Sequence, residues 1–323
     1  STTRIAPRAV LRTSEQTRII VCEEDEVGVL HRRDPRGASA ASETIKHAVT
    51  ALVASRRRSL VATARTRPQE AFLEQSGTVL RWMQGLPAET FELPTVLPAW
   101  TVQQLIGHLV NVHAGFLASL DQPTTDTALP IHEFVTRYRR DVEMIMAATL
   151  ETSAGLTGPE VVARLESVTD DLTSRLEAGV RLAQVIMTRR GPITIEDYIA
   201  TRIVELVVHT DDLNRSVPDT QPAPLHRSAL ARCTRTLAAI LARQRPGRSV
   251  EVRVPPYAAV QCGIGDPGPT HSRGTPPNVV ETNPLTFFRL ATGRTSWTDA
   301  VAEGAVHASG LRANLAPVLP LLS

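Results

Sequence analysis

Five long amphipathic segments occupy most of residues 68–213. Apolar side chains recur in them at intervals of three and four residues, which places these side chains on one face of an α-helix. Two segments begin with a threonine that is followed three residues later by Gln104 or Asp197, a pattern that caps helix N-termini. Because long helices joined by short loops pack side by side, we predict an antiparallel helical bundle. The segments are residues 68–84, 101–112, 131–150, 159–176 and 194–213.

The sequence after Asn214 has a different pattern. A Pro-rich stretch at 218–224 is followed by one more amphipathic segment at 225–243. Short runs typical of β-strands come next, and Asn283-Pro284 and Ser296 mark the starts of two short helices. We therefore predict a helical domain at 67–216 and a small α+β domain at 217–323. The predicted strands are residues 250–254, 258–262, 279–280 and 305–309.

Residues 1–66 fit neither pattern. Arg, Thr and Ser alternate without periodicity over the first 18 residues, and an acidic run follows at 23–26. Such a segment cannot bury enough apolar surface to offset the entropy that ordering costs. We predict a poorly ordered N-terminal extension, and a functional basic arm is the alternative.

Charge and hydrophobicity exclude several classes of protein. The formal net charge is +2, so the chain lacks the excess of positive charge that a dedicated nucleic-acid binder uses against phosphates. No apolar run approaches the ~18 residues of a membrane span, and no signal peptide is expected at the start. The three cysteines are far apart, which argues against a disulfide framework and a thiolate zinc site. We expect a cytoplasmic protein, and its oligomeric state stays open.

Three side chains form the candidate metal site. Glu205 and His209 lie one turn apart on a predicted helix, so they project from the same face. His108, on another capped helix, lies among apolar residues and is expected to face the bundle interior. Two imidazoles and one carboxylate give a divalent ion three protein ligands and leave one position open, as in catalytic zinc sites. No catalytic residue is assigned.

Other interpretations of these residues remain open. A Glu–His pair at this spacing also occurs on solvated helix faces, and Arg202 could pair with Glu205 and compete with a metal ion. Asp212 could orient an imidazole or be an exposed charge at the helix end. His113 is five residues after His108, which turns it off that face, so we expect it at the surface or behind the site.

Two motifs carry a resemblance to a known family. Residues 97–109 read LPAWTVQQLIGHL, and residues 202–213 read RIVELVVHTDDL. Together they resemble the mycothiol-dependent maleylpyruvate isomerase family, within the DinB-like four-helix bundles. Gln104 stands where an acidic residue is usual in that family. Residues 279–293, VVETNPLTFFRLATG, resemble the small sterol-carrier-like domain that many members carry.

The resemblance covers residues 68–323 and implies a function. His108, Glu205 and His209 match the positions that hold the family's metal, for which zinc is expected, and mycothiol is the implied co-substrate. The chain would then be an isomerase or thiol transferase that acts on a small electrophilic substrate, such as an unsaturated carboxylate. An arginine, Arg202 or one of the second domain, could hold a substrate carboxylate.

A non-catalytic binding protein is the competing hypothesis. The sterol-carrier-like domain would enclose a lipid or another hydrophobic ligand, and the metal site of the bundle would be structural. The same apolar side chains could equally form an ordinary domain core. They are Val250, Val252, Val254, Phe287, Phe288, Leu290 and Trp297.

Overall fold

The computed structural model divides the chain into two units, Ser1–Ala62 and Thr63–Ser323. The first unit is described only at three strands, β1 (Val10–Arg12), β2 (Arg18–Val21) and β3 (Val27–Val29), which pair antiparallel in that order. Apart from these strands, the N-terminal extension predicted at residues 1–66 lies outside the described residues. In the second unit the structure describes residues 67–98, 100–265 and 276–322.

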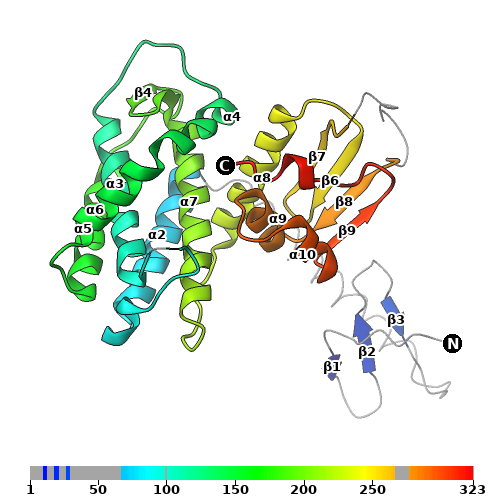
Figure 1. The fold of residues 1–323 in the computed structure, drawn as a ribbon, viewed down its shortest axis with the longest axis horizontal. Coiled ribbons are helices and arrows are strands. Elements are labelled where there is room, and N and C mark those ends of the chain that lie inside the picture. The colour runs from blue at the N-terminus through cyan, green and yellow to red at the C-terminus, as the bar shows by residue number, and fades with distance from the viewer. Residues whose placement is uncertain are drawn as a thin grey trace, which may run out of the picture. The chain divides into compact units, whose positions relative to one another are not determined.

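Four long helices form the bundle of the second unit (Figure 1). Helix α3 packs against α6 and α7, and α2 packs against α6 and α7. Their apolar faces meet in one core that contains Phe72, Leu109, Leu172 and Ile199. The prediction of a helical bundle is confirmed. The four helices are α2 (Pro68–Gln84), α3 (Val102–Leu120), α6 (Gly158–Glu177) and α7 (Ile195–Ser216).

The predicted caps fix where the two site helices begin. Thr101 Oγ1 accepts a hydrogen bond from the Gln104 amide (3.3 Å), and Gln104 Oε1 accepts one from the Thr101 amide (2.8 Å), so α3 starts with a complete capping box. Thr194 Oγ1 accepts a hydrogen bond from the Asp197 amide (3.1 Å) at the start of α7. These bonds satisfy backbone donors that the first turn of a helix leaves free.

The prediction of one helix over 131–150 is wrong. The segment consists of α4 (Ile131–Phe134), the 3₁₀ helix η2 (Val135–Asp141) and α5 (Val142–Ser153). A hairpin that was not predicted, β4 (Val185–Thr188) and β5 (Gly191–Thr194), contacts this segment. Arg137 Nη1 donates to the Arg190 carbonyl (2.7 Å), and Arg190 Nε lies 2.8 Å from Asp141 Oδ2. Contacts with Arg190, about 50 residues further along the chain in the hairpin, therefore hold the 3₁₀ helix η2.

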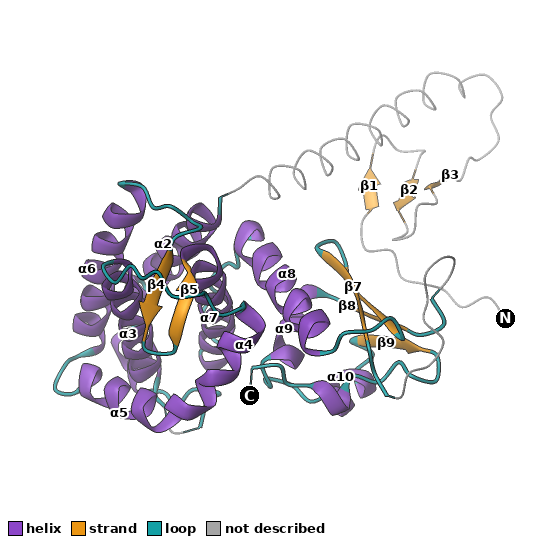
Figure 2. Cartoon of the chain, turned by 90° about the horizontal axis from the view of Figure 1, so that it is seen from above, coloured by secondary structure: helices purple, strands orange, loops and turns teal. Residues whose placement is uncertain are grey.

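The second half of this unit is the predicted α+β domain. Its four-stranded sheet has the order β7-β6-β8-β9, in which only β6 and β8 run parallel. Helices α8 and α9 lie between the bundle and these strands (Figure 2). The elements are α8 (Arg227–Gln244), β6 (Val250–Val254), β7 (Ala258–Cys262), β8 (Val279–Thr282), α9 (Pro284–Ala291), α10 (Trp297–Ala302) and β9 (Val306–Ser309).

Alternation along β6 directs Val250, Val252 and Val254 into the core of the α+β domain, where each is at most 1% exposed. Phe287 and Phe288 of α9 are buried in the same core. Among the helices that the structure describes, none has the length and apolar character that crossing a membrane requires.

Candidate functional site

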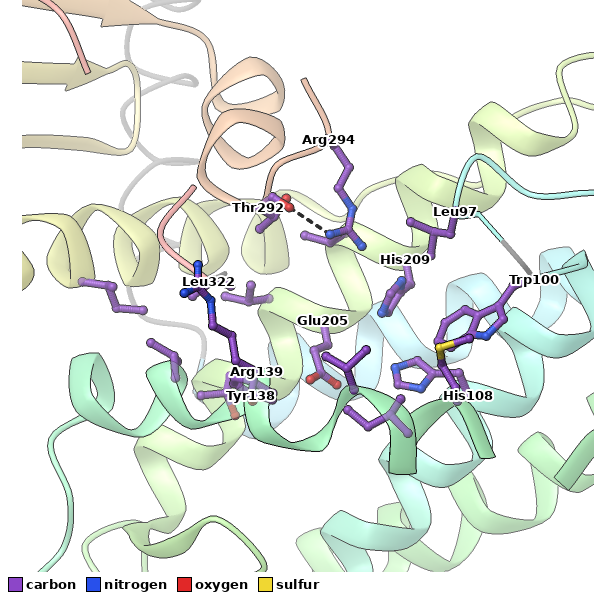
Figure 3. A pocket seen from close by; sticks show the side chains of 18 residues that line it. Leu97, Trp100, His108, Tyr138, Arg139, Glu205, His209, Thr292, Arg294 and Leu322 are labelled. Carbon is purple, nitrogen blue, oxygen red and sulfur yellow. Dashed lines mark hydrogen bonds between the residues drawn. The ribbon is translucent and has the colours of Figure 1, made fainter. Parts of the chain in front are cut away.

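The structure brings His108 and His209 together across two helices. The imidazole of His108 on α3 and that of His209 on α7 have centroids 4.9 Å apart and meet edge to face. The indole of Trp100, just before α3, lies 5.1 Å from the His108 ring. Figure 3 shows Glu205 and His209 projecting from α7 into the cavity that His108 lines from the opposite helix. We call His108, Glu205 and His209 the donor set.

Glu205 is held from one side by Arg202. Arg202 Nη2 lies 3.2 Å from Glu205 Oε1 and also donates to the Tyr138 hydroxyl at 2.5 Å. Burial alone would raise the pKa of Glu205, but the positive charges beside it, above all Arg202, outweigh burial and lower it. Glu205 is therefore ionised at neutral pH. Arg202, which could compete with a metal ion, engages only Oε1 of Glu205. The other oxygen of Glu205, Oε2, is buried and has no hydrogen-bond partner.

Asp212 lies behind His209 and is fully buried. Its Oδ2 is 3.1 Å from His209 Nδ1, and a carboxylate can only accept, so Nδ1 carries a proton and Nε2 is the ring nitrogen that could offer a lone pair. Arg294 Nη2 donates to the same carboxylate at 2.9 Å. Burial alone would raise the pKa of Asp212, but its hydrogen bonds and the adjacent positive charges lower it to about 2. Of the two roles considered for Asp212, the structure supports the orienting one.

Arg294 connects the α+β domain to the site. It follows α9, 82 residues beyond its partner Asp212, and it lines the cavity together with Thr292 and Leu322. A second pair strengthens the connection: Arg289 of α9 binds Asp211 of α7 through two hydrogen bonds of 2.8 and 2.6 Å. The C-terminal domain therefore forms part of the cavity wall.

The cavity has a volume of about 570 Å³. A second cavity of about 200 Å³ shares His108 and Glu205 with it and is also lined by Arg190 and Arg202. Burial and, next, the charge of His209 lower the pKa of His108 to about 3, so this imidazole is neutral at pH 7. A neutral imidazole has a lone pair that can bind a metal ion.

The donor set contains side chains of the kinds that bind zinc, but in the described part of the chain they do not form a group that could hold a metal ion. Across residues 67–98, 100–265 and 276–322, no three His, Cys, Asp or Glu side chains form a group that could hold a metal ion. Two buried polar atoms of the set, His108 Nδ1 and Glu205 Oε2, have no hydrogen-bond partner. Buried polar atoms of this kind are normally satisfied, and imidazole nitrogens and carboxylate oxygens are zinc ligands. Metal ligation by the donor set remains a prediction.

His113 is not at the surface, contrary to one of our expectations. It is only 2% exposed, its Nδ1 lies 2.9 Å from Thr169 Oγ1 of α6, and its ring contacts Phe72. The five-residue step from His108 turns His113 toward α2 and α6. His113 is buried there because other helices cover α3 on more than one face.

Sequence patterns assigned no role to three residues that line the cavity: Trp100, Tyr138 and Arg139. Trp100 lies in the first family motif, residues 97–109, so the sequence did contain a signal for it. Tyr138 and Arg139 lie in the 3₁₀ turn, and no spacing rule connects that turn to α7.

Comparison with known proteins identifies both domains. Residues 72–214 match the mycothiol maleylpyruvate isomerase N-terminal domain, and residues 226–321 match the bacterial SCP ortholog domain. The chain thus combines a mycothiol maleylpyruvate isomerase N-terminal domain with an SCP-type domain. All three donor-set residues lie in the isomerase-type domain, and Arg294 lies in the SCP-type domain.

Several solved structures resemble the chain, including the following two. One is the mycothiol-dependent maleylpyruvate isomerase, with a TM-score of 0.49 and 16% identity over 76% of this chain and 95% of that chain. The other is a histidine-to-alanine mutant of the mycothiol-dependent maleylpyruvate isomerase, with a TM-score of 0.49, 17% identity and the same coverage. No curated protein matches the chain.

Proposed function

We propose that the chain is a metal-dependent, mycothiol-using isomerase or thiol transferase that acts on a small electrophile, such as an unsaturated carboxylate. One observation carries this proposal: two imidazoles and a carboxylate from two helices line one cavity, and two of their buried polar atoms are unpaired. The isomerase-type domain at residues 72–214 supports the choice of thiol chemistry.

His108, Glu205 and His209 are the residues that would hold a divalent cation, with zinc as the expected metal. A bound cation would stabilise a thiol as the nucleophilic thiolate at neutral pH. Asp212 fixes the tautomer of His209 and leaves Nε2 as the donor atom. Glu205 would offer Oε2, the oxygen that Arg202 does not engage.

The arginines expected to hold a substrate carboxylate are engaged within the protein. Arg202 donates to Glu205 and Tyr138, and Arg294 donates to the Asp212 carboxylate and the Thr292 carbonyl. Arg139 also lines the cavity, and planar guanidinium groups bind carboxylates through paired hydrogen bonds. The SCP-type domain, from which Arg294 comes, therefore acts on the site through Asp212.

The non-catalytic alternative finds less support in the SCP-type domain. The strand and helix residues expected to surround a hydrophobic ligand, Val252 and Phe288 among them, are fully buried in the domain core. Burial of this kind is what an ordinary core requires.

A thiol-consumption assay tests the proposal. The purified chain is incubated with mycothiol and an unsaturated dicarboxylate, before chelation, after chelation and after zinc is restored. We expect turnover that requires mycothiol, disappears on chelation and returns with zinc. Turnover that ignores chelation would refute the metal role, and bound lipid in mass spectra without any thiol-dependent turnover would favour the carrier.

A further inference from the structure

The donor set borders two cavities of different size. His108 and Glu205 line both of them, whereas His209 lines only the larger one. The larger cavity also has Arg139 and Arg294 in its wall, so it offers polar groups as well as apolar surface (Figure 3). A ligand in either cavity therefore lies against the imidazole of His108 and the carboxylate of Glu205.

The volumes suit two ligands of different size. The smaller cavity, of about 200 Å³, corresponds to roughly seven water molecules at ~30 Å³ each, so it has room for a small molecule only. The larger cavity, of about 570 Å³, lies within the range of sites for drug-sized ligands, roughly 300–1,000 Å³. A small carboxylate and a larger thiol can therefore each occupy a cavity of their own.

Positive charge exceeds negative charge around the smaller cavity. Its wall contains three guanidinium groups, those of Arg189, Arg190 and Arg202, and one carboxylate, that of Glu205. Asp141 is shared, because its Oδ2 lies 2.8 Å from Arg190 Nε and 3.6 Å from Arg189 Nη2. Among these five groups, three positive charges meet two negative ones. One bound carboxylate would balance the sum, and enclosed charges are normally paired.

Asn111 of α3 adds an unpaired donor to this wall. Its Oδ1 accepts a hydrogen bond from the Thr152 hydroxyl (2.8 Å), while its Nδ2 is buried and has no hydrogen-bond partner. The hydroxyls of Ser119 and Thr188 already donate to backbone carbonyls at 2.7 and 2.8 Å. The Asn111 amide therefore joins the guanidinium groups as a donor for a ligand, and carboxylate oxygens are acceptors that match both.

Arg189 is the guanidinium that a ligand can engage at least cost. Its side chain is 51% exposed, and its 3.6 Å distance to Asp141 is too long for a hydrogen bond. Its Nη1 contacts the sulfur of Met144 at 2.9 Å, and a thioether is a weak acceptor. A bound carboxylate would give Arg189 a stronger partner and leave the closer pair of Arg190 and Asp141 intact.

We infer that the smaller cavity binds the substrate carboxylate through Arg189, Arg190 and the Asn111 amide, while the thiol occupies the larger cavity. This inference rests on the proposed function and specifies where each of its two substrates binds. The two substrates then meet at the wall that both cavities share, where His108 and Glu205 lie.

Binding of crotonate, a small unsaturated monocarboxylate, tests the site without the thiol. Calorimetric titration of the purified chain should show binding before and after chelation, and crotonamide, the neutral analogue, should bind at least tenfold more weakly. Arg189→Gln and Asn111→Leu should each weaken crotonate binding about tenfold, because each removes a donor to a charged group. Arg140→Gln is the matched control, since Arg140 is exposed on η2 and lines neither cavity.

Three results of this titration would overturn the inference. The first is equal affinity in the parent, Arg189→Gln and Asn111→Leu. The second is a loss that appears in Arg139→Gln instead, which would place the carboxylate in the larger cavity. The third is binding that disappears on chelation and is the same in all variants, which would assign the carboxylate to a metal ion.

Turnover separates this inference from the proposed function. In the thiol-consumption assay, Arg189→Gln should raise KM for the unsaturated dicarboxylate about tenfold and leave KM for mycothiol unchanged. A higher KM for mycothiol with an unchanged KM for the dicarboxylate would overturn the inference and leave the proposed function intact. If crotonate binds as expected and no thiol-dependent turnover occurs, the carboxylate site stands and the proposed function fails.

Discussion

Replacing Asp212 by asparagine should both destabilise the protein and disturb the site. The carboxylate is fully buried and receives Arg294 at 2.9 Å, Arg215 at 3.5 Å and His209 at 3.1 Å. Loss of one partner of a buried ion pair costs about 3–5 kcal/mol, because the other charge stays buried without compensation. The side chains of Arg294 and Arg215 keep 20% and 28% of their exposure, so we expect the lower end, about 3 kcal/mol.

Urea unfolding at pH 7 measures this loss. A destabilisation of about 3 kcal/mol corresponds to a melting temperature lower by roughly 6–12 °C for a unit of this size. Asp219→Asn, at an exposed loop position, serves as the control and should stay within about 0.5 kcal/mol of the parent.

A double-mutant cycle isolates the contact between the domains. If Asp212 and Arg294 interact as the structure describes, Asp212→Asn and Arg294→Met should be non-additive by about 1–3 kcal/mol. Zinc affinity should fall about 10–100-fold in Asp212→Asn, because His209 loses its orienting carboxylate. Additive effects in the cycle, or a loss of stability no larger than in Asp219→Asn, would refute the reasoning.

Two further predictions concern packing and thiol reactivity. Gly107→Ala should destabilise the protein by about 1–3 kcal/mol in urea unfolding, because a Cβ there would lie 2.2 Å from Ser153 Oγ. In the same helix, Gly115→Ala meets nothing within 4 Å and should stabilise it by about 0.5–1 kcal/mol; equal effects would contradict this packing. Burial raises the pKa of the Cys233 thiol and raises that of Cys262 to about 11, so iodoacetamide at pH 8 should label neither in the native protein. Peptide mass spectra that show rapid labelling of either cysteine would count against their burial.

Periodicity and capping signals predicted the helices of the bundle and the strands of the SCP-type domain well. Both signals are local, and the structure keeps them: Thr101 and Thr194 cap the site helices as their spacing indicates. The short hairpin at 185–194 escaped prediction because two four-residue strands give little alternation to detect.

Long-range partners account for the rest of what the sequence did not reveal. Arg294 reaches Asp212 across 82 residues, and no spacing rule selects one arginine among so many. The 3₁₀ turn that brings Tyr138 to the cavity depends on the hairpin, because Arg190 fixes it through Asp141 and the Arg137 side chain. The pairing of His108 with His209 was predicted from their places on two capped helices and from the resemblance of both motifs to one family.

Metal content tests the central claim directly. The parent, His108→Ala, Glu205→Gln and His209→Ala are stripped with a chelator, incubated with zinc, desalted and analysed by elemental mass spectrometry. His307→Ala, at an exposed strand position, is the control. We predict about one zinc ion per chain in the parent and the control, and a strong loss in the three donor-set variants. Zinc content in those variants equal to that of the parent would contradict the account.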